Sequence, residues 1–129
     1  MGPNLTFDTG ALIAWERNSQ AINKVVALAT ELERRIYVPE VVLAEWWRGH
    51  TRRRADMLRA VTIDRLTTPQ AKAAGEVLAN LTAGGAALTI DALVMASAAS
   101  RGDIVYTSDP EDLLRLQAHF PAVKTILRA

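Results

Sequence analysis

Cysteine is absent from the 129-residue sequence, and this absence excludes several kinds of chemistry. A chain without cysteine has no disulfide framework, no thiolate zinc site and no cysteine nucleophile. The absence also fits a reducing compartment. Aromatic residues are few, at 5% of the chain, so we expect a core built mainly from Ala, Leu and Val.

Long apolar runs are missing as well. No run approaches the roughly 20 residues that a membrane-spanning helix needs. The first residues do not place a basic segment before an apolar one, as a secretory signal does. We therefore predict a cytoplasmic protein with no membrane contact. The length and the 50% hydrophobic content predict one globular domain over residues 1–129.

Short apolar segments alternate with segments of helical periodicity along the chain. Strands are expected at 5–7, 36–38, 61–66, 104–107 and 123–127. Helices are expected at 9–15, 19–35, 40–49, 51–60, 68–82, 91–100 and 110–116. Ser19 and Thr89 are expected to cap helices, Gly102 to end one, and Gly84-Gly85 to interrupt the chain between two helices. This alternation predicts an α/β fold with a central, mostly parallel sheet of four to five strands.

Four acidic residues stand beside apolar stretches: Asp8, Glu45, Asp91 and Asp109. Asp8 and Asp109 follow predicted strands, so we expect both at the carboxyl edge of the sheet, where open parallel sheets bind ligands. Glu45 lies four residues after Val41 on the helical face that we expect to be buried. Carboxylates that converge repel one another, and a hard divalent cation relieves the repulsion. The group predicts a metal-dependent enzyme that acts on a phosphodiester.

Each acid taken alone has a structural explanation. Asp8 and Asp109 each have the sequence context of a helix N-cap. Asp91 near a helix start would interact favourably with the helix dipole, and Glu45 could be partly exposed. The four together, each flanked by apolar residues, favour a site.

Four segments carry a resemblance to a known family, and they are residues 7–13, 38–45, 89–98 and 105–113. Over nearly the whole chain, the sequence resembles a PIN-domain ribonuclease, and most closely a VapC-type toxin of a toxin–antitoxin pair. The resemblance implies a PIN-like three-layer α/β/α sandwich. It also implies an RNA substrate, a cognate antitoxin protein and a homodimer.

The resemblance further implies roles for individual residues. Asp8, Glu45, Asp91 and Asp109 correspond to the catalytic and metal-binding acids of the family, with Thr107 and Asp112 as auxiliary residues. They would hold one or two Mg²⁺ or Mn²⁺ ions, with Asp8 and Asp91 as the best candidates for direct ligands. The metal would activate a water that attacks the phosphodiester in line. Gly10 departs from the family pattern, in which Ser or Asn is common at this position.

Arginines gather between Arg48 and Arg59, where five arginines accompany one acid. We expect Arg48, Arg52, Arg53 and Arg54 to contact the substrate or a partner, because arginine binds phosphates through paired hydrogen bonds. His50 would add charge at low pH. A solvated helix face is the simpler interpretation. Of the adjacent Trp46 and Trp47, one is expected at an interface or stacked on a base.

Other classes of protein share parts of this pattern. The tripeptide Asp8-Thr9-Gly10 also occurs in aspartic proteases, whose fold is all-β. A phosphoaspartate phosphohydrolase needs a second Asp where Gly10 stands, and a receiver domain needs adjacent acids after the first strand. A catalytically silent binding module that keeps the fold is the non-enzymatic alternative.

Overall fold

Five parallel strands form the centre of the molecule. The computed structural model describes residues 2–81 and 85–129. Within them the strands are β1 (Leu5–Phe7), β2 (Ile36–Pro39), β3 (Thr62–Asp64), β4 (Ile104–Thr107) and β5 (Thr125–Arg128). Their order in the sheet is β3-β2-β1-β4-β5, and every neighbouring pair is parallel. The expected α/β fold with a parallel sheet is confirmed.

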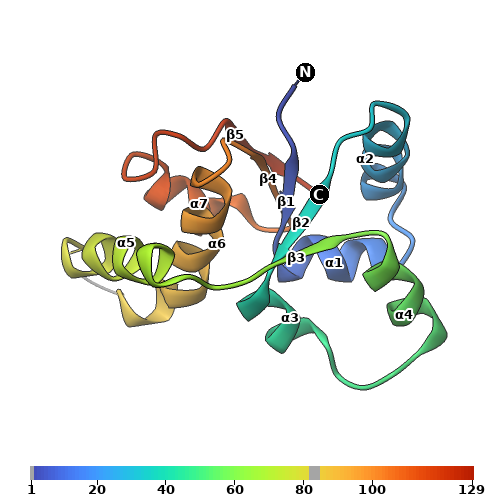
Figure 1. Ribbon diagram of the computed structural model, residues 1–129, viewed down its shortest axis with the longest axis horizontal. Helices are drawn as coiled ribbons and strands as arrows, with labels where there is room; N and C mark the ends of the chain where they lie inside the picture. The colour runs from blue at the N-terminus through green and yellow to red at the C-terminus, as the bar shows by residue number, and fades with distance from the viewer. Residues whose placement is uncertain (1, 82–84) are drawn as a thin grey trace.

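Helices cover both faces of this sheet. They are α1 (Thr9–Glu16), α2 (Gln20–Glu31), α3 (Glu40–Trp46), α4 (Arg52–Arg59), α5 (Thr68–Ala79), α6 (Thr89–Ala99) and α7 (Pro110–Gln117), with a 3₁₀ turn at Ala86–Leu88. Helices α1, α2 and α4 lie on one side, and α5, α6 and α7 lie on the other (Figure 1). None of the helices in the described residues is long and apolar enough to cross a membrane.

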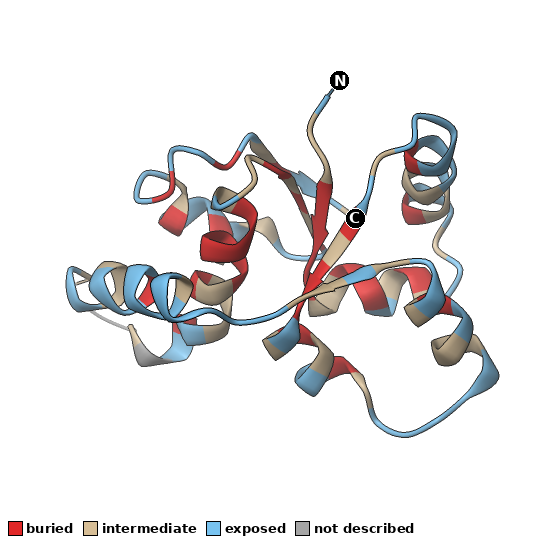
Figure 2. Cartoon of the chain, viewed as in Figure 1, coloured by how far each residue is buried: buried red, intermediate tan, exposed pale blue. Residues whose placement is uncertain are grey.

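The core lies where the central strands meet α1 and α6. All three residues of β1 are buried, as are Val38 of β2 and Val105 of β4. Figure 2 shows buried residues concentrated along β1 and α6. Helix α6 packs closely because its buried positions include the small residues Ala92, Ala96 and Ala98. The core is mainly aliphatic, as expected, with a few aromatic residues such as Phe7 among them.

Arg101, just after α6, ties this helix to the sheet. Its guanidinium donates to the buried carboxylate of Asp103 at 2.8 Å and pairs with Asp64 at the end of β3 at 2.9 Å. It also lies 3.8 Å from the ring centroid of Tyr37 on β2. Thr6 of β1 donates to the same Asp103 oxygen at 2.8 Å. One cation therefore links α6 to the three strands β1, β2 and β3.

Several predicted boundaries are wrong, and each has a local cause. The helix expected to reach Arg35 ends at Glu31, because Glu33 adopts a left-handed φ of 56° that stops it. The helix expected to reach Gly49 ends at Trp46, and Gly49 has a φ of 111°. Thr89 is not a cap, since α6 already includes it and Leu88 holds the cap position.

The remaining boundaries differ less. Ser19 holds the cap position of α2 but makes no side-chain cap bond. Gly102 has a φ of 76° and its N–H donates to Ala98, so it ends α6 as expected. Helix α5 ends at Ala79, short of the expected boundary at Thr82, which lies outside the described residues together with Gly84.

Candidate active site

A cleft opens at the carboxyl ends of β1 and β4, the two strands where the direction of chain progression across the sheet reverses. Parallel sheets bind ligands at such a switch point. The cleft has a volume of about 190 Å³. Its lining residues are Asp8, Thr9, Gly10, Glu45, Ile90, Asp91, Val94, Thr107, Ser108, Asp109 and Asp112. The structure therefore brings all four predicted acids, together with both predicted auxiliary residues, into one cleft.

Asp8 has both of the roles that its position suggested. It caps α1 by accepting a hydrogen bond from the backbone N–H of Ala11 at 2.9 Å, and it also lines the cleft. The residue is 9% exposed. Burial raises the pKa of its carboxyl, while hydrogen bonding from Thr107 and Ala11 lowers it and the charge of Glu45 raises it. The balance is a raised pKa, so burial dominates.

Asp91 occupies the first turn of α6, where the helix meets the cleft. The residue is half-buried, and burial is the main cause that raises its pKa to about 6. The next causes are repulsive charges on Asp112, Asp8, Glu45 and Asp109. Like-charge repulsion of this kind is typical of carboxylates that share a site without a cation.

Glu45 does not lie on a buried face, contrary to the prediction. Its side chain is exposed on α3, and it reaches the cleft from the solvent side. The helical period put it in line with Val41 and Val42, but the fully buried stripe of α3 runs through Val42 and Trp46, and Glu45 lies beside that stripe. The hydroxyl of Thr9 donates to Glu45 Oε1 at 2.6 Å, which fixes the carboxylate at the rim of the cleft.

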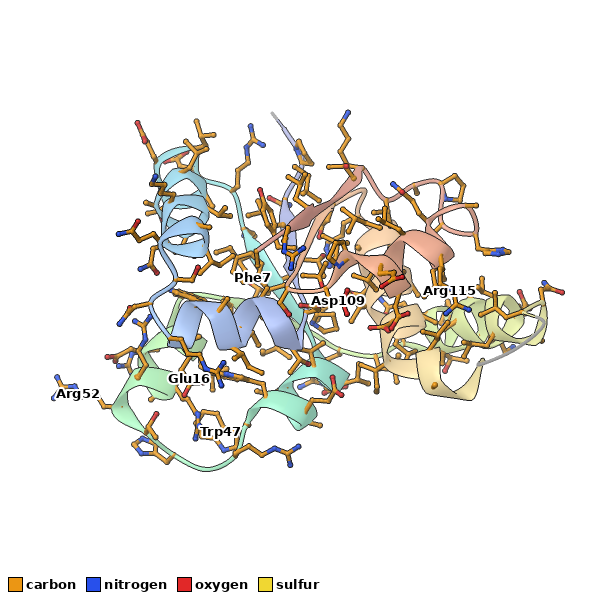
Figure 3. All side chains as sticks on the ribbon, turned by 180° about the vertical axis from the view of Figure 1, so that it is seen from behind. Phe7, Glu16, Trp47, Arg52, Asp109 and Arg115 are labelled. Atoms are coloured by element: carbon orange, nitrogen blue, oxygen red, sulfur yellow. The ribbon has the colours of Figure 1, made fainter. Side chains whose placement is uncertain are left out.

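Thr107 and Asp109 connect the end of β4 to α7. Thr107 is buried, and its hydroxyl accepts a hydrogen bond from the Asp109 backbone N–H at 3.2 Å. Asp109 is exposed and caps α7 by accepting from Glu111 N at 3.4 Å (Figure 3). Asp112 lies in the first turn of α7, with Arg115 at 3.6 Å.

Ser108 is a cleft residue that sequence reasoning missed, and it explains Gly10. A Cβ placed on Gly10 would lie 2.0 Å from Ser108 Oγ and 2.9 Å from Ser108 Cβ. A larger residue at position 10 is therefore excluded unless Ser108 moves. The Ser108 hydroxyl occupies this space and lines the cleft. Only a contact across the sheet reveals this relation, because the two residues are far apart in sequence.

The donor chemistry of the cleft suits a hard divalent cation, since five carboxylates and two hydroxyl residues from β4 and its end face it. Within the described residues, however, no three acidic or histidine side chains are close enough to form a metal-binding group. The residues of the cleft fit a divalent metal in their donor chemistry.

The predicted arginine group divides into different environments. Arg53 donates to Trp15 O at 2.6 Å, and Arg54 pairs with Glu16 at 3.1 Å, so both hold α4 against α1. Arg52 projects away from the molecule (Figure 3). Arg48 lines a second cleft next to the acidic one.

The two adjacent tryptophans also differ. Trp46 is buried and its Nε1 donates to Glu16 at 2.8 Å, so it is a core residue and is not available to stack on a base. Trp47 is half-buried beside an open hollow lined with Leu43, Ala44 and Leu58. Its ring lies 6.4 Å from that of His50. Of the pair, Trp47 is the one that fits the predicted interface role.

The all-parallel sheet excludes the all-β fold of an aspartic protease. A search of curated proteins gave no significant match. The model of the family described as the PIN domain matches residues 5–118, which includes every residue of the acidic cleft. PIN-domain proteins are generally nucleases and generally use divalent metal ions. The chain therefore belongs to the PIN domain family, a family of nucleases.

Proposed function

We propose that this protein is a metal-dependent endoribonuclease. The observation that carries the proposal is the cleft at the switch point of the sheet, which five carboxylate residues line and where burial and like-charge repulsion raise the pKa of Asp91 to about 6. Such a cleft suits the capture of a cation and the handling of a phosphodiester. Perturbed carboxylates in a cleft are typical of functional sites.

The residues of the cleft would have different roles in the reaction. Asp8 and Asp91 would hold the cation most directly, because they are the more deeply buried acids of the quartet. Glu45, held by the Thr9 hydroxyl at the rim, would orient the attacking water. The Ala11 N–H keeps Asp8 in place, and the Thr107 hydroxyl holds the backbone of Asp109. Asp109 and Asp112 add negative charge. A bound Mg²⁺ or Mn²⁺ would polarise a phosphoryl oxygen and favour ionisation of a water.

We further propose that the protein acts in the cytoplasm as the toxin of a type II toxin–antitoxin pair and forms a homodimer. The resemblance over residues 7–13, 38–45, 89–98 and 105–113 supports the toxin role. The hollow beside Trp47, lined mainly by apolar side chains, supports a protein contact on α3 and α4. Copurification with the product of a neighbouring short gene, followed by mass measurement in solution, tests both the antitoxin and the dimer.

The central experiment is a cleavage assay on structured RNAs with Mg²⁺, Mn²⁺ or EDTA. We expect the wild type to cleave with either metal and to stop in EDTA. Asp8→Asn and Asp91→Asn should each lower kcat by about 100-fold or more while retaining the fold, because the cleft loses charge that holds the cation. Asp56→Asn is the matched control, since Asp56 is an exposed acid on α4 that pairs with Arg59.

Retained metal-dependent cleavage by a well-folded Asp8→Asn or Asp91→Asn protein would refute the proposal. A wild type that does not cleave but binds RNA would instead support the silent binding module. Gly10, which departs from the family pattern, is the observation that favours this second candidate. Calorimetric titration with Mn²⁺ separates the two, because the binding module is expected to bind no metal.

A further inference from the structure

A second cleft adjoins the acidic one, and we call it the arginine cleft. Its lining residues are Ile13, Glu16, Arg17, Glu45, Trp46, Arg48 and Arg54. It has a volume of about 490 Å³, which lies within the usual range of ligand pockets. Glu45 lines both clefts, so the two spaces meet at this carboxylate.

The three arginines of this cleft are not equivalent. Arg54 is held by Glu16 and by the carbonyl of Gly49 at 2.9 Å, so its charge is already compensated. Glu16 is itself shared with the indole N–H of Trp46. Arg17 and Arg48 are exposed, and neither side chain has a hydrogen bond or an ion pair within the part of the chain that the structure describes. They are the two cations of the cleft that remain available for a ligand.

The positions of these two arginines fit an extended anionic ligand. Arg17 follows α1, and Arg48 follows α3, so they approach the cleft from two elements. Ile13 lies one turn before Arg17, is 36% exposed and gives the cleft an apolar wall. A strand whose reacting phosphodiester lies among the carboxylates has this cationic space directly beside it, past Glu45. Arginine suits such an interaction because its guanidinium binds phosphate through paired hydrogen bonds.

We propose that the arginine cleft is a phosphate subsite, in which Arg17 and Arg48 bind one backbone phosphate of the RNA strand on a single side of the cleavage point. This inference rests on the proposed ribonuclease function. The subsite gives the bound strand one direction, because the strand must extend from the acidic cleft toward the C-terminal ends of α1 and α3. The Ile13 wall would contact the ribose or base of the same nucleotide.

Binding of a labelled single-stranded oligoribonucleotide, followed by fluorescence anisotropy in EDTA, measures the subsite without cleavage. Arg17→Gln and Arg48→Gln should each raise Kd by about tenfold, the effect expected when one charge-assisted hydrogen bond is removed. The double variant Arg17→Gln/Arg48→Gln should reduce the slope of log Kd against log salt by about 0.7, because the one phosphate of the subsite is then no longer neutralised. Unchanged melting temperatures are expected, because neither side chain has an internal partner within the described residues.

Arg35→Gln is the matched control, since Arg35 is exposed beyond the opposite end of the sheet. Its Kd should equal that of the wild type. Arg52→Gln distinguishes binding in the arginine cleft from general electrostatic attraction by the basic segment. Arg52 belongs to the same segment but lines neither cleft. Equal increases in Kd from Arg52→Gln and Arg48→Gln would overturn the proposal. So would an acidic peptide that competes better than RNA for the wild type and fails to bind the two variants.

Replacement of single phosphates by neutral methylphosphonates then locates the phosphate that the subsite binds during cleavage with Mn²⁺. Replacement at one linkage, or at either of two adjacent linkages, on one side of the cleavage point should raise the KM of the wild type. The same replacement should have no further effect in Arg17→Gln/Arg48→Gln. An identical interference pattern in the variant refutes the subsite but leaves the nuclease intact. A wild type that neither binds nor cuts RNA refutes the proposed function and the subsite together.

Discussion

The carboxylate of Asp91 experiences two opposing effects at the start of α6. The helix dipole favours an acid in the first turn by about 0.3–1 kcal/mol. Burial and four neighbouring carboxylates act in the other direction. They prevail over the dipole, as the rise of the pKa from 3.8 to about 6 shows. The ionised carboxylate is therefore unfavourable in the folded state at neutral pH when no cation is bound.

The sign of this shift gives a pH dependence of stability. Between about pH 4 and pH 6, folded Asp91 holds a proton that the unfolded chain has released, so its contribution to stability is highest below pH 4 and falls as the pH rises through 6. Asp91→Asn should raise the free energy of unfolding at pH 7 in EDTA by about 1 kcal/mol, a value reduced for solvent screening of a half-exposed group.

Urea denaturation at pH 4 and pH 7 measures this effect, with Asp56→Asn as the control. The gain from Asp91→Asn should disappear at pH 4, where the wild-type carboxyl is protonated. An Asp91→Asn protein that is no more stable than the wild type at pH 7 would contradict the electrostatic account.

Gly10 is the second residue whose neighbours determine what it tolerates. Alanine at this position of α1 is favoured by helix propensity by about 1 kcal/mol. The new Cβ would nevertheless approach Ser108 Cβ to 2.9 Å, and overpacking of this kind costs about 1–3 kcal/mol. We expect Gly10→Ala to destabilise the protein, and the addition of Ser108→Gly to recover most of the loss.

A double-mutant cycle by thermal unfolding tests this coupling. Gly75→Ala is the control, because a Cβ at Gly75 of α5 meets no atom within 4 Å. That substitution should stabilise the protein by about 1 kcal/mol. Additive effects of Gly10→Ala and Ser108→Gly on stability would show that Ser108 is not the cause of the destabilisation by Gly10→Ala.

At the scale of elements, α6 is positioned by the polar contacts of Arg101. This cation compensates Asp103, which is 0% exposed and whose Oδ1 has no hydrogen-bond partner within the described residues. Removing one partner of a buried pair leaves an uncompensated charge and costs about 3–5 kcal/mol. Arg101→Met should therefore lower the free energy of unfolding by this amount, and Arg101→Lys by less, because one ammonium cannot reach Asp64 and Asp103 together with the same geometry.

Urea denaturation compares these variants with Arg59→Met, which removes an exposed ion pair worth about 0–1 kcal/mol. Adding Asp103→Asn to Arg101→Met should restore part of the stability, because the buried charge is then gone. A destabilisation by Arg101→Met no larger than that by Arg59→Met would mean that the contacts to the sheet do not hold α6.

At the scale of the whole molecule, the strand order β3-β2-β1-β4-β5 creates the acidic cleft. Asp8 follows β1 and Thr107 ends β4, and the parallel register of these neighbouring strands brings their carboxyl ends together. Helix α6 supplies Asp91 from one layer, and α3 supplies Glu45 beside it. Residues far apart in the sequence thereby share one site.

Much of the fold is predictable from the sequence because the position of each strand depends on local pattern. The strand residues 5–7 and 104–107 were predicted with the bounds they have, since short apolar runs next to acids and turns give clear limits. Helix ends were less predictable. The stops after Glu31 and Trp46 depend on how the chain must return to the sheet.

The sequence by itself determined the α/β class and the acids available for metal chemistry, because apolar periodicity and residue type are local properties. Only the tertiary structure decided that Glu45 is exposed, that Arg53 and Arg54 are bound to α1 while Arg48 faces a cleft, and that Ser108 requires Gly10. These facts arise from packing between segments far apart in the chain, where the shape of the neighbours and not the local period decides which side chains remain free.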